Sequence, residues 1–363
     1  MAQLQLQEPK VIKGETIDGR TVSLTSSQPR QLGLFQSFLD NASVYSNTIA
    51  LYDALPMYFT TNQEMNRLRT PDGCFLKSVE RQFEYKEAGS DKTQKYTLRM
   101  TPARIQDKNG NDKEYYPTRA ERSPIDALRR LATKPEHGCY LNDIAGVMFT
   151  QNQLRRELKE YNHGRNTPDL RKQLKICNKT GLEVNLYGSK KVIVSAPILP
   201  VLIIPSREEW EANPDCMCYA QFNPLITDSI NELSYRQFDY DTYMRLKRHL
   251  SQWWFLRLSH HFIQAHVLTS YKITAKRIKN DSYLLNNEVL TADIREIDRV
   301  LEEFQKHDII AKVERDVRKK GKEIVNVEYT LYPTLNFSAG MRNANHRFNT
   351  VRTEATRLQM ANT

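Results

Sequence analysis

The chain has 363 residues, of which 53 are Lys or Arg and 43 are Asp or Glu, so its formal net charge is +10 at pH 7. This length predicts two or three domains with buried cores, and an aromatic content of 9% argues against wholesale disorder. No run of 18 apolar residues occurs and the first residues do not resemble a secretory signal, so we expect neither a membrane-spanning helix nor export.

The cysteines argue against a disulfide framework and against a metal site. There are five, an odd number, and no two form a CxxC pair. Cys216 and Cys218 are too close together and too isolated to hold zinc without distant ligands. We therefore expect no disulfide, no metal and no cofactor, in a protein of a reducing cytoplasm.

Residues 1–78 are expected to form an N-terminal arm. Up to about residue 43 the sequence is polar, rich in Gln and Ser, and has no sustained period, which is typical of an extended segment. Residues 44–60 predict a short helix that stops at Pro56, or an element packed on the next domain.

Residues 79–218 predict a winged helix-turn-helix domain. Two strands within residues 79–106 flank a Gly-Ser-Asp turn and predict a hairpin. Helices are then expected from Pro124 to Ala132, from Thr150 to Tyr161 and from Pro168 to Asn178, followed by strands Leu182–Tyr187 and Lys191–Val194. We assign Thr150 and Thr167 as N-caps. A winged helix-turn-helix has this order of elements: two helices, a Gly-containing turn, a third helix and a hairpin.

A second unit of the same kind is predicted over residues 219–340, and a polar C-terminal tail over 341–363. Its helices are expected at Tyr240–Leu258, Ile273–Lys279 and Leu290–His307, and its strands at Ile309–Val317 and Glu323–Leu331. The predicted fold class is therefore α+β, with two tandem winged-helix domains behind an extended arm.

Positive charge gathers where these units would meet DNA. Residues 150–195 hold ten basic residues and four acids, and residues 311–322 hold six basic residues and two acids. In the first unit, Leu170, Leu174 and Cys177 are expected to face inward on the third helix. The candidate DNA-binding residues of this unit are Arg165, Asn166, Thr167, Arg171, Lys172, Lys175, Asn178, Lys190 and Lys191. Arg171 and Asn178 are candidates to bind bases, and the lysines to bind phosphates; the alternative is a solvated helix face.

In the second unit the third helix carries acidic as well as basic residues, so the hairpin tip is the stronger candidate for DNA contact. The DNA-binding residues expected here are Lys276, Arg277, Lys279, Arg295, Arg299, Arg318, Lys319, Lys320 and Lys322. An ordinary charged turn is the alternative for the tip.

The arm contains one short apolar motif, formed by Gln31, Leu32, Leu34 and Phe35. Apolar side chains on a polar, extended arm suit insertion into an apolar pocket of a partner. The motif resembles the pentapeptide with which bacterial replication proteins bind the polymerase sliding clamp, although Gly33 stands where Ser or Asp is usual. Packing on its own domain is the alternative.

The sequence lacks the residues that three classes of enzyme require. A tyrosine recombinase needs Arg directly before the His that corresponds to His261, where this chain has His260. A rolling-circle nickase needs two His separated by one apolar residue, and an ATPase of the P-loop class needs GxxxxGK[ST]; the sequence has neither motif. We expect no catalytic residue and no enzymatic activity.

Longer segments resemble the theta-type plasmid replication initiators of the RepA/TrfA class. They are residues 47–58 (NTIALYDALPMY), 115–118 (YYPT), 146–159 (GVMFTQNQLRRELK), 222–230 (FNPLITDSI) and 243–250 (YMRLKRHL). The resemblance spans roughly residues 31–340. It implies a bacterial cytoplasmic protein that binds repeated origin sequences (iterons) in double-stranded DNA and helps to open the origin.

The same resemblance implies several partners and a mode of regulation. The partners are a host initiator, the replicative helicase and the sliding clamp, and a monomer–dimer equilibrium would control plasmid copy number. Single-stranded DNA is a further possible ligand. One alternative function is a winged-helix transcription regulator or partition protein that binds operator DNA. A second is an interaction scaffold whose positive charge is incidental.

Overall fold

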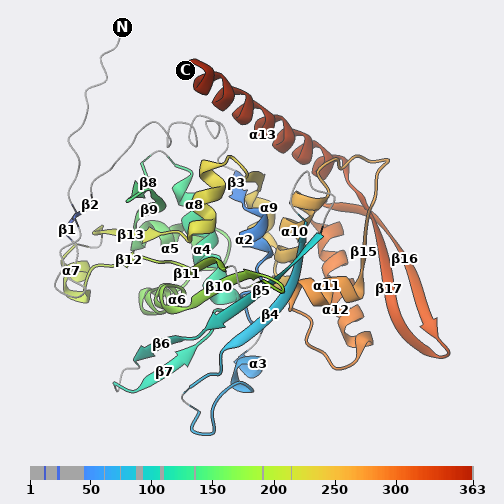
Figure 1. Ribbon diagram of the computed structural model, residues 1–363, viewed down its shortest axis with the longest axis horizontal. Helices are drawn as coiled ribbons and strands as arrows, with labels where there is room; N and C mark the ends of the chain where they lie inside the picture. The colour runs from blue at the N-terminus through green and yellow to red at the C-terminus, as the bar shows by residue number, and fades with distance from the viewer. Residues whose placement is uncertain are drawn as a thin grey trace.

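The computed structural model describes residues 45–361 except 61, 74, 87–92, 107–109, 135, 190–191 and 214. It also describes two short paired strands, β1 (Ile12–Lys13) and β2 (Ser23–Leu24). The described chain is a mixed α/β structure with several small antiparallel sheets (Figure 1). No helix among these residues is long and apolar enough to cross a membrane.

Two large hydrophobic cores divide the molecule, one within residues 49–235 and the other mostly within 238–341. From here on we call residues 45–235 the first unit and residues 236–361 the second unit. These bounds take the place of the predicted ones, 79–218 and 219–340. The cores adjoin directly, because β3 of the first unit pairs with β14 of the second.

The first unit contains all elements up to α8. These are β3 (Tyr45–Thr48), α2 (Ala50–Ala54), α3 (Asn62–Asn66), β4 (Val79–Lys86), β5 (Thr93–Thr101), β6 (Ala103–Gln106), β7 (Asp112–Tyr115), α4 (Arg119–Ala132), β8 (Gly138–Leu141), β9 (Ile144–Thr150), α5 (Gln151–Glu160), α6 (Thr167–Lys179), β10 (Gly181–Leu186), β11 (Val192–Pro197), β12 (Leu202–Ile203), α7 (Arg207–Ala212), β13 (Met217–Gln221) and α8 (Pro224–Asn231). Two four-stranded sheets, β11-β10-β5-β4 and β12-β13-β9-β8, and the hairpin β6-β7 surround α4 and α6.

The helix predicted from Pro124 begins five residues earlier, at Arg119. Thr118 and Glu121 form a capping box, in which the Thr118 hydroxyl accepts the Ala120 amide and Glu121 accepts the Thr118 amide. Pro124 therefore lies inside α4, and the capping box sets the start of the helix. The inward residues Ile125, Leu128 and Leu131 are buried, as predicted.

The expected helix-turn-helix and hairpin elements are present in order as α5, α6, β10 and β11. Thr150 caps α5, as predicted, through a capping box with Gln153. The cap of α6 is Asn166 rather than Thr167, because the Asn166 carboxamide accepts the Asp169 amide at 2.8 Å. Thr167 and Pro168 are then the first two residues of the helix.

Within residues 44–60 the predicted helix is only the five-residue α2. The four residues of β3 that precede it are held in a sheet by β14, far along the chain. Pro56 follows the C-cap, Leu55, so the predicted end of the helix is confirmed.

The second unit contains β14 (Arg236–Asp239), α9 (Tyr240–Arg245), α10 (His249–His261), β15 (Tyr271–Thr274), α11 (Ala275–Ser282), α12 (Leu290–Lys306), β16 (Ile310–Lys320), β17 (Glu323–Pro333) and α13 (Leu335–Ala361). β15, β17 and β16 form one antiparallel sheet, whose long hairpin β16–β17 projects from the side of the molecule (Figure 1). α12 has the predicted extent, and Ile297, Leu301 and Phe304 are buried.

Three predictions for the second unit need correction. The helix predicted over Tyr240–Leu258 is broken into α9 and α10, and the helix predicted at Ile273–Lys279 begins only after strand β15. β16 continues through Arg318 to Lys320, so the turn of the hairpin is shorter than expected and centres on Gly321, whose φ is +62°. In the first two cases backbone groups are satisfied by contacts with distant segments, which local patterns do not show.

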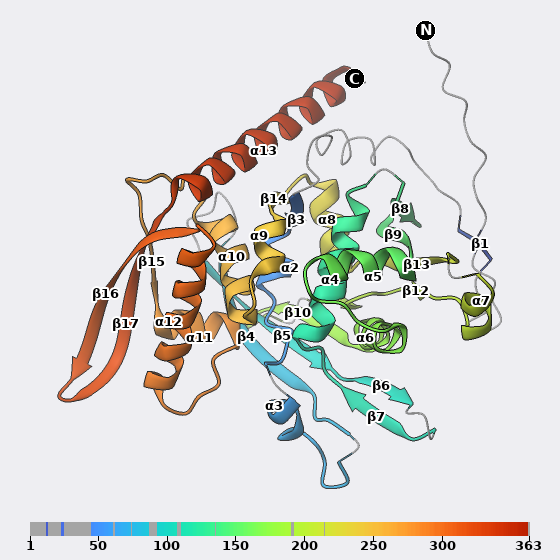
Figure 2. The same cartoon turned by 180° about the vertical axis from the view of Figure 1, so that it is seen from behind.

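The C-terminal segment, expected to be a polar tail, forms the helix α13 and contributes to a core. α13 runs along one edge of the molecule (Figure 2). Its residues Phe337, Met341, Ala344 and Val351 are buried, and Phe337 and Met341 belong to the second core.

Candidate nucleic-acid interface

A concentration of positive charge lies at the turn between α5 and α6. An open hollow of about 740 Å³ is lined here by Asn152, Arg155, Arg156, Lys159, Gly164, Arg165, Asn166 and Asp215. Four of these residues are cations and one is an acid. The hollow is too open to enclose a small molecule, but its charge suits the phosphate backbone of a nucleic acid.

Short local contacts hold this turn in shape. The Arg155 guanidinium donates to the Arg165 carbonyl at 3.4 Å, and Arg165 donates to the Gly164 carbonyl at 2.9 Å. Asn166, which caps α6, places the N-terminus of that helix at the rim of the hollow. The helix dipole adds partial positive charge at this end.

Helix α6 has the buried and exposed faces that its periodicity predicts. Leu170, Leu174 and Cys177 are fully buried against the first core. Lys172 and Lys175 are exposed, and the Lys172 ammonium lies 4.2 Å from the centre of the Tyr115 ring. These two lysines are available to an anionic partner.

The two candidate base-binding residues of α6 are held by the protein itself. Arg171 donates to the Pro205 carbonyl at 2.7 Å, and Asn178 donates to the Leu199 carbonyl at 2.8 Å. Both side chains are half-buried and anchor the segment that follows β11.

Two other predicted contacts of the first unit fall outside the described residues. These are Lys190 and Lys191 at the tip of the β10–β11 hairpin, and the arm motif of Gln31, Leu32, Leu34 and Phe35. On either side of the hairpin tip, Tyr187 and Val192 are exposed.

Around α11, the predicted cations differ in what they contact. Lys276 is exposed. Arg277 forms ion pairs with Glu84 at 2.6 Å and with Asp281 at 2.5 Å. Burial alone would lower the pKa of Arg277, but these two carboxylates raise it. Lys279 pairs with the buried carboxylate of Asp293 at 2.6 Å. Arg277 and Lys279 therefore stabilise the position of α11, with 36% and 34% of their side chains exposed, whereas Lys276 is exposed.

On α12 and the long hairpin most of the predicted cations are exposed. Arg295 and Arg299 share the solvent side of α12, and Arg299 pairs with Glu296 at 3.0 Å. Lys319, Lys320 and Lys322 are exposed at the hairpin tip, while Arg318 lies 3.6 Å from Glu328.

Sequence reasoning did not select three cations that the structure places in the hollow, Arg155, Arg156 and Lys159. They lie on the solvent side of α5, the helix before the expected reading helix. The excess of basic residues over 150–195 was the signal that included them, but periodicity could not separate them from an ordinary solvated face.

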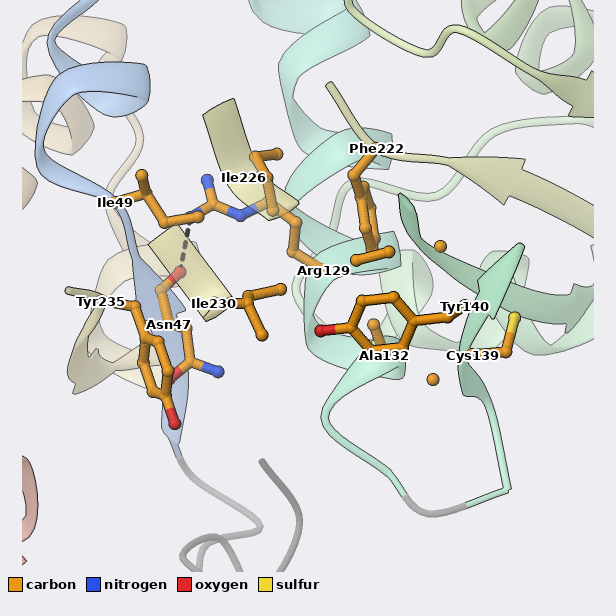
Figure 3. A pocket seen from close by; sticks show the side chains of 13 residues that line it. Asn47, Ile49, Arg129, Ala132, Cys139, Tyr140, Phe222, Ile226, Ile230 and Tyr235 are labelled. Carbon is orange, nitrogen blue, oxygen red and sulfur yellow. Dashed lines mark hydrogen bonds between the residues drawn. The ribbon is translucent and has the colours of Figure 1, made fainter. Parts of the chain in front are cut away.

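A small cavity of the first unit leaves no room for a cofactor. It lies between the β8–β9 hairpin, α8 and β3, and Figure 3 shows its mostly apolar lining. Its free space of about 30 Å³ holds one or two water molecules. Arg129, at its edge, is already paired with Asp53 at 2.6 Å.

No group of His, Cys, Asp or Glu among the described residues is arranged to hold a metal ion. Arg257 and His260, which resemble part of a recombinase box, serve the fold. Arg257 pairs with Asp281 at 3.0 Å, and His260 lies 2.9 Å from the Thr48 hydroxyl.

Comparisons with known proteins place few constraints on the chain. No protein-family model matches it, and no curated protein matches it. Among solved structures, it is similar to the Pi initiator protein crystallised in complex with iteron DNA. The identity is 11% and the TM-score 0.39, over 59% of this chain and 91% of that chain. At this TM-score the likeness carries no argument about function.

Proposed function

We propose that this chain is a non-enzymatic, sequence-specific binder of double-stranded DNA, built from two winged-helix units, that initiates plasmid replication at repeated origin sequences. The observation that carries the proposal is the hollow at the α5–α6 turn, where Arg155, Arg156, Lys159 and Arg165 surround the N-terminus of α6. A helix that enters the major groove needs phosphate contacts at this end to set its position.

The order of elements supports two winged-helix units. In the first, α4, α5 and α6 are followed by the hairpin β10–β11. In the second, α10, α11 and α12 are followed by β16–β17, and β15 pairs with β17. We propose that Lys172 and Lys175 on α6, Arg295 and Arg299 on α12, and the cations at both hairpin tips contact DNA.

The replication role rests on the resemblance to RepA/TrfA-class initiators described above. With it we propose a bacterial cytoplasmic protein that opens the origin together with a host initiator and recruits the replicative helicase and the sliding clamp.

DNA binding is tested by titrating a fluorescent duplex that carries the plasmid's repeats, at two salt concentrations, against a scrambled duplex. We expect tighter binding to the repeats and a steep fall in affinity with salt. Lys175→Ala should weaken binding to both duplexes. Arg342→Ala removes the same charge from α13 and is the matched control, with no expected effect. Equal affinity for the two duplexes would contradict sequence-specific binding.

Clamp binding is a separate test. A pull-down with immobilised clamp should retain the unmodified chain and lose a Leu34→Ala/Phe35→Ala variant. Full retention of the variant would remove the clamp from the proposal and leave DNA binding untouched.

A further inference from the structure

Three cations lie at the break between α9 and α10: Arg245, Lys247 and Arg248. Arg245 and Lys247 are exposed, and the Arg248 side chain is 39% exposed. Arg245 is the last residue of α9, and Lys247 and Arg248 lie between α9 and α10. All three therefore belong to one short segment, in which Leu246 is buried.

This segment is attached directly to the α5–α6 turn of the first unit. The His163 ring nitrogen Nε2 lies 3.0 Å from the Met244 carbonyl, and Arg119 donates to the Leu246 carbonyl at 3.2 Å. His163 is two residues from Arg165, which lines the hollow. The segment that carries the three cations therefore lies next to the turn that lines the hollow.

On its other side the same segment is attached to α12. Glu303 accepts the Lys247 amide at 2.5 Å, and Arg248 pairs with Glu296 at 3.1 Å. Glu296 also pairs with Arg299. In Figures 1 and 2, α9 lies between α5 and α12, in agreement with these contacts.

The charge of this segment is only partly neutralised by its neighbours. Glu296 is shared between Arg248 and Arg299, and Glu303 is occupied by a backbone amide and the Ser251 hydroxyl. The ammonium of Lys247 and the guanidinium of Arg245 are exposed to solvent. Exposed basic residues thus lie at the α5–α6 turn, at the α9–α10 break and on the solvent side of α12, with Glu296 and Glu303 between the last two.

We propose that Arg245, Lys247 and Arg248 form a phosphate-binding bridge that contacts the DNA backbone between the two segments bound by the two units. This inference rests on the proposed function, since it names a further contact of the same interface. The bridge adds affinity without sequence preference, because it meets phosphates and no base edges.

The test uses the full chain and a labelled duplex carrying the repeats, with a scrambled duplex alongside. In Arg245→Ala/Lys247→Ala the slope of log affinity against log salt should fall by about 2, since each lost phosphate contact removes about 0.9. At 0.15 M salt this corresponds to a loss of affinity on the order of 30-fold, equal on both duplexes. In the unmodified chain, ethylation of the phosphates between the two DNA segments bound by the units should interfere with binding. In the double variant this interference should disappear.

Alanine at position 247 retains the amide that Glu303 accepts, so the fold should be kept, and an unchanged urea midpoint checks this. Arg342→Ala/Arg352→Ala removes two exposed charges from α13 and should leave the slope unchanged. An unchanged slope in Arg245→Ala/Lys247→Ala would overturn the bridge while DNA binding stands. Failure of the unmodified chain to bind any duplex would overturn the proposed function itself.

Discussion

At the residue scale, His249 is an unusual buried group. It is 8% exposed, and the centre of its ring lies 5.6 Å from the centre of the Tyr58 ring in an edge-to-face arrangement. Neither ring nitrogen has a hydrogen-bond partner among the described residues. Burial, and then the positive charges of Arg122, Arg119 and Arg81, hold the pKa of His249 well below its usual value of 6.5. The ring is therefore neutral in the folded protein.

This predicts a loss of stability in mild acid. Below pH 6.5 the unfolded chain binds a proton at His249 that the folded chain does not, so the free energy of unfolding falls as pH falls. The contribution is up to about 1.4 kcal/mol per pH unit. Urea unfolding of His249→Phe between pH 7 and 5 should show a smaller pH dependence. An identical dependence would contradict the assignment.

A second prediction concerns the buried pair of Asp53 and Arg129. Arg129 donates to both carboxylate oxygens, at 2.6 and 3.1 Å, and both side chains are 7% exposed. Removing one partner leaves a buried charge, so Asp53→Ala should cost about 3–5 kcal/mol in unfolding free energy. The double variant Asp53→Ala/Arg129→Met should cost less than the sum of the two single variants. Additive losses would show that the two side chains are not coupled.

At the scale of elements, the break between α9 and α10 is decided by one side chain of α12. Glu303 accepts hydrogen bonds from the Lys247 amide and the Ser251 hydroxyl, both at 2.5 Å. Arg119 donates a hydrogen bond to the Leu246 carbonyl. These contacts satisfy backbone groups that a continuous helix would satisfy internally.

Glu303→Ala should therefore destabilise the protein by about 1–3 kcal/mol, because two donors lose their acceptor. Glu303→Gln should cost less, since its amide oxygen still accepts one of them. Glu302→Ala, at the exposed neighbouring position, is the control with little expected effect. Chemical denaturation of the three variants measures the difference, and equal midpoints would refute the role of Glu303.

At the scale of the whole molecule, α4 joins the two units through buried polar contacts. Tyr243 of the second unit donates to Asp126 at 2.5 Å and accepts from the Arg122 guanidinium at 3.0 Å. Across the same boundary, Tyr283 exchanges two hydrogen bonds of 3.0 Å with the backbone of Gln82. The two Tyr243 contacts are buried and rigidify the arrangement, since their loss removes hydrogen bonds from the interior, whereas the Tyr283 contacts lie at the surface.

We therefore expect the two units to unfold in one cooperative transition. Tyr243→Phe should lower the free energy of unfolding by about 1–3 kcal/mol. Tyr187→Phe, the same change at a half-exposed position on the first hairpin, should have little effect. In urea, circular dichroism reports both units. Tryptophan fluorescence reports the second unit in a Trp210→Phe background, because the two remaining tryptophans, Trp253 and Trp254, both lie on α10. Two separate transitions in the unmodified chain would show that the units are independent.

Much of the local structure could be predicted because it depends on near neighbours. The 3.6-residue period and the Thr150 cap predict α5, and period and length predict α12. The turn at Gly188-Ser189 predicts the hairpin β10–β11, in which Gly188 has a φ of +75°. The concentration of basic residues around α5 and α6 was likewise visible in the sequence.

What the sequence by itself determined is the succession of α5, α6 and the hairpin β10–β11, that of α12 and the hairpin β16–β17, and the overall excess of positive charge. Only the tertiary structure decided which cations face solvent. Arg277 is paired with Glu84, Arg171 holds the Pro205 carbonyl, and Arg165 remains on the rim of the hollow. The physical reason is that a cation is neutralised by acceptors that folding brings close, and these can be almost two hundred residues away along the chain, as Glu84 is from Arg277.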